Sequence, residues 1–144
     1  MDMGGFLMKL GRDCLIALLL VAPIQAGEVA APTIAKIIRI VASSGNNVKV
    51  ACLDPEVAAE LGKLGLSLDP EARIVWAISD QDVVRLAKQN KLVICGQLGQ
   101  LAQGGAVAIV AEGGRPSIYI RPANVALSKV SLPDAVIKIG KVVK

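Results

Sequence analysis

Three features of the sequence predict an α/β fold built on a mostly parallel five-stranded sheet. Short apolar segments alternate with helical segments of about ten residues between positions 48 and 95, which indicates parallel strands joined by right-handed crossovers. Two further strand-like segments flank a glycine-rich turn at 112–116, which is typical of an antiparallel hairpin. The 144 residues are 53% hydrophobic, enough for one domain with a sizeable core. We expect an antiparallel edge hairpin, helices on both faces and a strand order near 2-1-3-4-5.

In the first half of the chain, apolar spacing and capping residues mark the helices. Residues 33–42 place three isoleucines and Val41 at helical spacing directly behind Pro32. Asp54 and Ser79 are predicted N-caps of two further helices, which reach about positions 64 and 89. The strands of this half are short, apolar and rich in β-branched residues, and they cover 48–52, 74–78 and 92–95.

The second half departs from this alternation. Residues 96–105 are rich in glycine and leave room for only one or two helical turns. The two hairpin strands are expected at 106–111 and 117–120, and a short helix at 122–127. The motif Ser131-x-x-Asp134 predicts the cap of a last helix. That helix is expected to carry four apolar residues: Val136, Ile137, Ile139 and Val143.

The N-terminus has the pattern of a secretory signal peptide over residues 1–26. Two basic residues precede an apolar run at 14–22, and a proline ends it. This run of about nine residues is shorter than the roughly 20 that cross a bilayer, and a buried core helix is the alternative interpretation. We expect export to the periplasm and cleavage after Ala26 or Ala30. A single domain at 27–144 would remain, without direct membrane insertion.

Composition argues against several classes of function. The chain has no histidine, so it has no Ser-His-Asp triad, no Cys-His pair and no imidazole metal ligand. Aromatic residues make up 2% of the chain, and the net charge of +4 is not gathered into a basic block, so nucleic acid is not an expected partner. We therefore expect a protein without catalytic residues, metal or cofactor, which acts by binding.

Two cysteines, Cys52 and Cys95, end predicted strands that are neighbours in the expected order. Adjacent strands lie about 4.8 Å apart, which is close enough for a disulfide once register is allowed for. Such a bond persists in an oxidising compartment. The alternative is a pair of buried free thiols that behave as small apolar side chains.

A candidate ligand crevice lies at the carboxyl ends of the parallel strands, where open α/β sheets usually bind ligands. Asp54, Ser79, Asp80 and Gly96 are expected there. Helix capping explains two of these residues equally well. The glycines from position 96 onward match neither the Walker nor the dinucleotide-binding pattern, so tight turns explain them better.

A candidate partner-contact patch surrounds the hairpin and consists of Arg115, Tyr119 and Arg121. Alternation along the strand places Tyr119 and Arg121 on one face of the sheet. Tyrosine and arginine are both enriched in interface hot spots. The alternative is that these side chains extend over the sheet with only their polar ends in water.

The C-terminal half carries a series of short motifs in a fixed order. Residues 104–120 read Gly-Gly-Ala-Val-Ala-Ile-Val-Ala-Glu-Gly-Gly-Arg-Pro-Ser-Ile-Tyr-Ile, a Gly-Gly pair and two strands around a Glu-Gly-Gly-Arg turn. Asn124-Val-Ala, Val130-Ser131 and the Ala-Val-Ile-Lys-Ile-Gly-Lys segment at 135–141 follow. On these motifs the region 51–143 resembles the YfiR/HmsC-like periplasmic proteins. The two cysteines also match the positions of a disulfide in that family.

The resemblance implies a soluble periplasmic regulator. Such proteins bind the periplasmic part of a membrane-anchored diguanylate cyclase and hold it inactive, which lowers cyclic-di-GMP and biofilm formation. A disulfide would then link inhibition to the redox state of the periplasm. A periplasmic small-ligand-binding component of an uptake or sensory system is the alternative function. Whether the chain forms a homodimer stays open.

Overall fold

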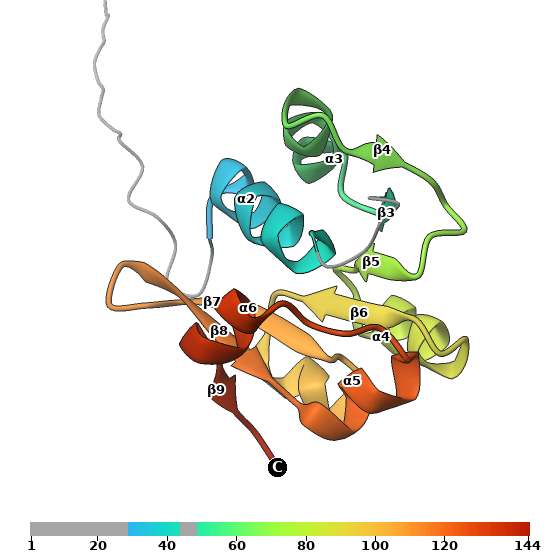
Figure 1. The fold of residues 1–144 in the computed structure, drawn as a ribbon, viewed down its shortest axis with the longest axis vertical. Helices are drawn as coiled ribbons and strands as arrows, with labels where there is room; N and C mark the ends of the chain where they lie inside the picture. The colour runs from blue at the N-terminus through green and yellow to red at the C-terminus, as the bar shows by residue number, and fades with distance from the viewer. Residues whose placement is uncertain (1–28, 44–48) are drawn as a thin grey trace, which may run out of the picture.

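The computed structural model describes residues 29–43 and 49–144, which form a seven-stranded mixed sheet with helices on both faces (Figure 1). The predicted signal peptide at 1–26 lies outside the described residues. Among the described helices, none is both long enough and apolar enough to span a bilayer.

The sheet is mostly parallel, as predicted, and its strand order is β4-β3-β5-β6-β7-β8-β9. Only the hairpin pair β7–β8 is antiparallel; the remaining neighbours run parallel. The strands are β3 (Lys49–Cys52), β4 (Ser67–Leu68), β5 (Ile74–Trp76), β6 (Leu92–Cys95), β7 (Val107–Glu112), β8 (Arg115–Ile120) and β9 (Lys141–Val142).

The predicted strand number and order are wrong in two respects. The five expected strands follow one another across the sheet in chain order, so β5 lies between β3 and β6 instead of at the edge. Two additional strands of two residues each, β4 and β9, occupy the edges, and β9 covers the free side of the hairpin. Strands this short show no alternation, and therefore sequence periodicity does not reveal them.

The helices begin close to where the sequence places them. Asp54 accepts the backbone N–H of Glu56 at 3.0 Å, and Ser79 accepts that of Asp82 at 3.1 Å, so both predicted N-caps are confirmed. The helical segments are α2 (Ala31–Ala42), α3 (Pro55–Lys63), α4 (Asp80–Lys88), the 3₁₀ helix η1 (Leu98–Gln103), α5 (Pro122–Ser128) and α6 (Asp134–Ile139).

The last helix differs from its prediction. Its N-cap position is occupied by Pro133 and not by Ser131, and the helix ends at Ile139. Gly140 follows in extended conformation, and a Cβ at this position would overlap the side chain of Ile120. The chain therefore turns into β9, and Val143 packs beyond the helix on the other face of the sheet.

Two apolar clusters cover the two faces of the sheet. On one face, α2, α3 and α6 pack over strand residues that include Trp76 and Ile94. On the other face, α4 and η1 pack over Val75 and Val93. Each side chain is thus assigned to one face by strand alternation. Figure 1 shows α2 and α3 next to each other at the β3–β5 end, while α6 and β9 lie against β8.

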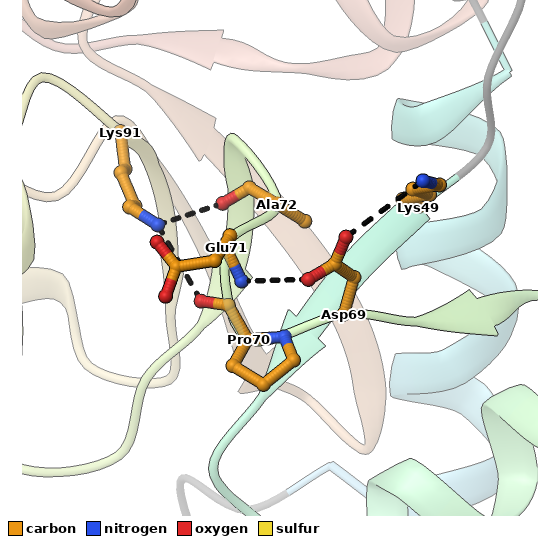
Figure 2. A network of polar contacts seen from close by, with 6 residues as sticks. All are labelled: Lys49, Asp69, Pro70, Glu71, Ala72 and Lys91. Carbon is orange, nitrogen blue, oxygen red and sulfur yellow. Dashed lines mark hydrogen bonds and ion pairs between the residues drawn. The ribbon is translucent and has the colours of Figure 1, made fainter.

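A small polar network holds the loop between β4 and β5 (Figure 2). Asp69 accepts the backbone N–H of Glu71 at 2.9 Å and lies 3.8 Å from the ammonium group of Lys49. Lys91, at the start of β6, donates to the carbonyl of Ala72 at 3.1 Å. These contacts fasten the loop at both ends, which keeps the short edge strand β4 in register with β3.

Candidate functional site

An apolar groove is the clearest candidate site among the described residues. It has a volume of about 490 Å³, within the range of natural ligand pockets. The groove lies between α5, the segment that follows it, α6 and the end of the sheet. Its lining residues are mostly apolar: Ile120, Pro122, Val125, Ala126, Lys129, Val130, Ser131, Leu132, Ile137 and Val142.

Apolar side chains surround this groove without being covered. Val136 of α6 is buried against the sheet, whereas the next residue, Ile137, is 53% exposed and lines the groove. Val142 of β9 also lines the groove and is exposed. Leu127 and Ile139 add exposed apolar surface on the same two helices. Exposed apolar side chains that gather around a groove are typical of an interaction site.

The groove is positioned by hydrogen bonds at the end of α5. The Ser128 hydroxyl accepts the backbone N–H of Val130 at 3.1 Å, and its side chain is buried. The Arg73 guanidinium donates to the Ser128 carbonyl at 2.7 Å and so links the loop before β5 to this turn. Lys129 adopts a left-handed conformation with φ of 60°, which ends the helix and turns the chain along the groove.

The C-terminal segment that forms the groove is rich in basic residues. The last 24 residues of the chain contain five basic residues and one acidic residue, so their net charge equals that of the whole chain. One of the five, Lys129, lines the groove directly. The basic residues are Arg121, Lys129, Lys138, Lys141 and Lys144, and the acidic residue is Asp134. Charge complementarity therefore favours a partner with apolar side chains surrounded by carboxylates.

The predicted partner-contact patch consists of Arg115, Tyr119 and Arg121, and the structure shows which contacts each of them makes within the chain. The Tyr119 hydroxyl donates to the carboxylate of Glu112, and the Lys141 ammonium lies 5.2 Å from the Tyr119 ring centroid. Arg121 is half-buried and donates to the Leu101 carbonyl at 2.9 Å, which joins η1 to the start of α5. Arg115 is exposed at the tip of the hairpin. Two of the three side chains therefore have intramolecular partners.

The predicted crevice is assembled only in part. Asp54 and Gly96 line one cavity at the carboxyl ends of the parallel strands. Ser79 is used as the cap of α4, and Asp80 accepts the side-chain N–H of Gln100 at 2.9 Å. These last two residues do not line that cavity.

The predicted disulfide between Cys52 and Cys95 is wrong, and both thiols are free. The prediction depended on neighbouring strands, but β5 separates β3 from β6. Cys52 packs against the cluster that contains Trp76, while Cys95 belongs to the cluster on the opposite face. Two strand spacings and opposite side-chain directions exceed the reach of a disulfide.

Burial controls the chemistry of Cys95 and gives a pH-dependent prediction. Desolvation raises the pKa of this thiol from 9.0 to about 12. The unfolded chain therefore loses this proton first as the pH rises, so the thiol's contribution to stability falls between pH 9 and 12. By linkage, ionisation of this thiol in the unfolded chain lowers the free energy of unfolding by about 1.4 kcal/mol at pH 10.

Urea unfolding of the wild type and of Cys95→Ala at pH 7.5 and 10 measures this contribution. Between pH 7.5 and 10 the free energy of unfolding should fall further in the wild type than in Cys95→Ala. The difference between these two decreases is the contribution of the Cys95 thiol. Cys52→Ala is the comparison variant: Cys52 is half-buried and desolvation also raises the pKa of its thiol, so this variant gives the share of the second thiol. Equal losses in the wild type and Cys95→Ala, or a disulfide-linked peptide containing both cysteines, would contradict this assignment.

Sequence reasoning missed the groove because its parts look like ordinary core residues. The sequence places Ile137 and Ile139 on a helix without showing which of its faces is covered, and it does not predict β9. One available signal was the spacing within 136–139, since Val136, Ile137 and Ile139 cannot all face the same side of a helix. A helix with apolar residues around its circumference needs a second surface to cover it.

The described residues thus define an α/β protein with a mixed sheet and an apolar groove, lined by one lysine, at its C-terminal end. No protein-family model matches the chain, and no curated protein matches it. The crystal structure of a conserved domain protein from Vibrio cholerae has a similar fold, with a TM-score of 0.60 and 12% sequence identity. The similarity covers 79% of this chain and 60% of that protein, so the chain spans less than two thirds of its length. At this identity the likeness concerns the fold alone.

Proposed function

We propose that the chain is a periplasmic, non-enzymatic regulator that binds the periplasmic part of a membrane-anchored diguanylate cyclase and inhibits it. The resemblance of residues 51–143 to YfiR/HmsC-like proteins supports the class of partner. The signal-peptide pattern of residues 1–26 supports the compartment. Inhibition would lower cyclic-di-GMP and biofilm formation.

The observation that carries this proposal is the uncovered apolar groove around Ile137 and Val142. Protein interfaces consist of an apolar centre that becomes buried and a polar rim that stays wet. The groove supplies the centre, and Lys129, its one charged lining residue, supplies a basic group at the rim. A partner segment with two or three apolar side chains and flanking carboxylates fits both.

Inhibition by such a module needs no chemical step. The regulator shifts the cyclase toward its inactive state if it binds that state more tightly than the active one. A coupling free energy of about 1–3 kcal/mol gives roughly 5–150-fold control, which a few apolar contacts in the groove can supply.

Direct binding tests the proposal. The full chain is mixed with purified periplasmic domains of the membrane-anchored cyclases that its organism encodes, and affinity is measured by calorimetry. At least one domain should bind, and its affinity should fall as salt is raised, because the rim charges are exposed and therefore screened. Absence of binding to every such domain would contradict the proposal, and salt-independent binding would contradict the role of the rim.

A further inference from the structure

Strand β9 lies at an edge of the sheet and is only two residues long (Figure 1). It consists of Lys141 and Val142, and both are exposed. They pair in parallel with Tyr119 and Ile120 of β8, and the Val143 N–H then donates to the Ile120 carbonyl at 2.8 Å. A strand this short makes few backbone hydrogen bonds, so its side-chain contacts decide how firmly it is docked.

The two residues of β9 lie on opposite faces of the sheet, because successive side chains of a strand alternate. Lys141 is in register with Tyr119, which packs against the cluster under α4 and η1. Val142 is in register with Ile120, which belongs to the other cluster, and both of these residues line the groove. Lys141 therefore lies on the face away from the groove, and the contacts that hold it also fix the place of Val142.

On that far face, Glu112 gathers the polar contacts of β9. The Lys141 ammonium donates to the Glu112 carboxylate at 3.0 Å, and the Tyr119 hydroxyl donates to the same carboxylate. The ammonium also lies 5.2 Å from the centroid of the Tyr119 ring. Hydrogen bonds from Tyr119, Ser117 and Lys141 lower the pKa of Glu112 from 4.5 to about 2, so this carboxylate is charged at neutral pH. Because Glu112 ends β7, these contacts join β9 to both strands of the hairpin.

From this arrangement we propose that Glu112 is a positioning residue for the groove: it holds Lys141 on the opposite face and so docks β9 with Val142 in the groove wall. When these contacts break, β9 leaves the edge of β8 and the groove loses that wall. The ion pair is exposed, so salt weakens it and favours release. The inference rests on the proposed function only for the role of the groove as a partner site, since docking of β9 is a property of the chain alone.

Hydrogen exchange of single backbone amides, measured by NMR on the full chain without a partner, tests this docking. The Val143 N–H exchanges when β9 leaves β8, whereas the Ala77 N–H, bonded to the Ile94 carbonyl at 2.9 Å inside the sheet, exchanges when the sheet opens. After correction for intrinsic rates, Val143 should exchange at least about ten times faster than Ala77. Lys141→Gln should speed the exchange of Val143 about three-fold or more.

Three further variants separate positioning from a general effect of charge. Glu112→Lys places two ammonium groups together and should speed Val143 exchange more than Lys141→Gln does. Combining Glu112→Lys with Lys141→Glu restores opposite charges, so exchange should be slower than with either change alone. Lys138→Gln is the matched control, because it removes the same charge from α6, and within the described residues Lys138 forms no ion pair. It should leave Val143 exchange unchanged.

The methyl signals of Val142 report the groove wall itself. They should move toward the values of an unstructured valine in Glu112→Lys, although the substitution lies on the other face of the sheet. Equal Val143 exchange in the wild type and Lys141→Gln would overturn the proposal, as would equal exchange of Val143 and Ala77 or unchanged Val142 signals in Glu112→Lys. None of these measurements involves a cyclase, so their failure is distinct from failure of the proposed function.

Discussion

Replacement of Gly104 by alanine should destabilise the protein by about 2–6 kcal/mol, which is a large share of the roughly 5–15 kcal/mol typical of a folded domain. Gly104 has a φ of +123°, a conformation that side chains with a Cβ rarely adopt. A Cβ at this position would also overlap that of Ala87 in α4. Backbone strain and overpacking each cost about 1–3 kcal/mol, and neither is relieved by rotating a side chain.

Gly99→Ala is the matched control for this change. Gly99 lies in η1, the 3₁₀ helix that Gly104 directly follows. Apart from its own helix backbone and chain neighbours, no atom lies within 4 Å of the position its Cβ would take, and its φ is not positive. Urea unfolding followed by circular dichroism measures both variants. The structure predicts a small change for Gly99→Ala and a large loss for Gly104→Ala. Similar stabilities of the two variants would show that η1 and α4 do not approach each other as described.

The local elements were predictable because their signals lie within a few residues. Asp54 and Ser79 cap the helices that their sequence context predicts. The hairpin turn is marked by Gly113 and Gly114, both with positive φ, as a two-residue turn between twisted strands requires. These features depend on backbone conformation and on neighbouring donors, and both can be inferred from sequence.

Strand order and side-chain partners were not predictable in the same way. Each crossover could place its strand on either side of the previous one, and no local residue decides between the two. The error in order also removes the geometric ground for the disulfide, since the strands of Cys52 and Cys95 are not neighbours. Similarly, only the folded chain shows that Arg121 binds Leu101, whereas Ile137 stays uncovered.

The second large effect concerns the groove. Ile137→Asp should weaken binding to the proposed cyclase partner by about 30-fold or more, because replacement of a hot-spot residue at the centre of an interface costs about 2 kcal/mol or more. The new carboxylate would be buried against an apolar partner surface and would face carboxylates on its rim. The isolated protein should fold normally, since Ile137 is 53% exposed.

Leu98→Asp is the matched control for Ile137→Asp. Leu98 is 46% exposed, and it belongs to η1, outside the groove. The substitution makes a comparable change in charge and hydrophobicity at a different surface. Thermal unfolding of both purified variants checks that any loss of binding does not reflect loss of folding.

Cellular cyclic-di-GMP tests inhibition through this groove most directly. The gene for the chain is deleted from its organism, and wild type, Leu98→Asp or Ile137→Asp is returned at equal protein levels. Cyclic-di-GMP should rise on deletion, fall again with the wild type and with Leu98→Asp, and stay high with Ile137→Asp. Unchanged cyclic-di-GMP on deletion, or full repression by Ile137→Asp, would contradict inhibition of a cyclase through this groove.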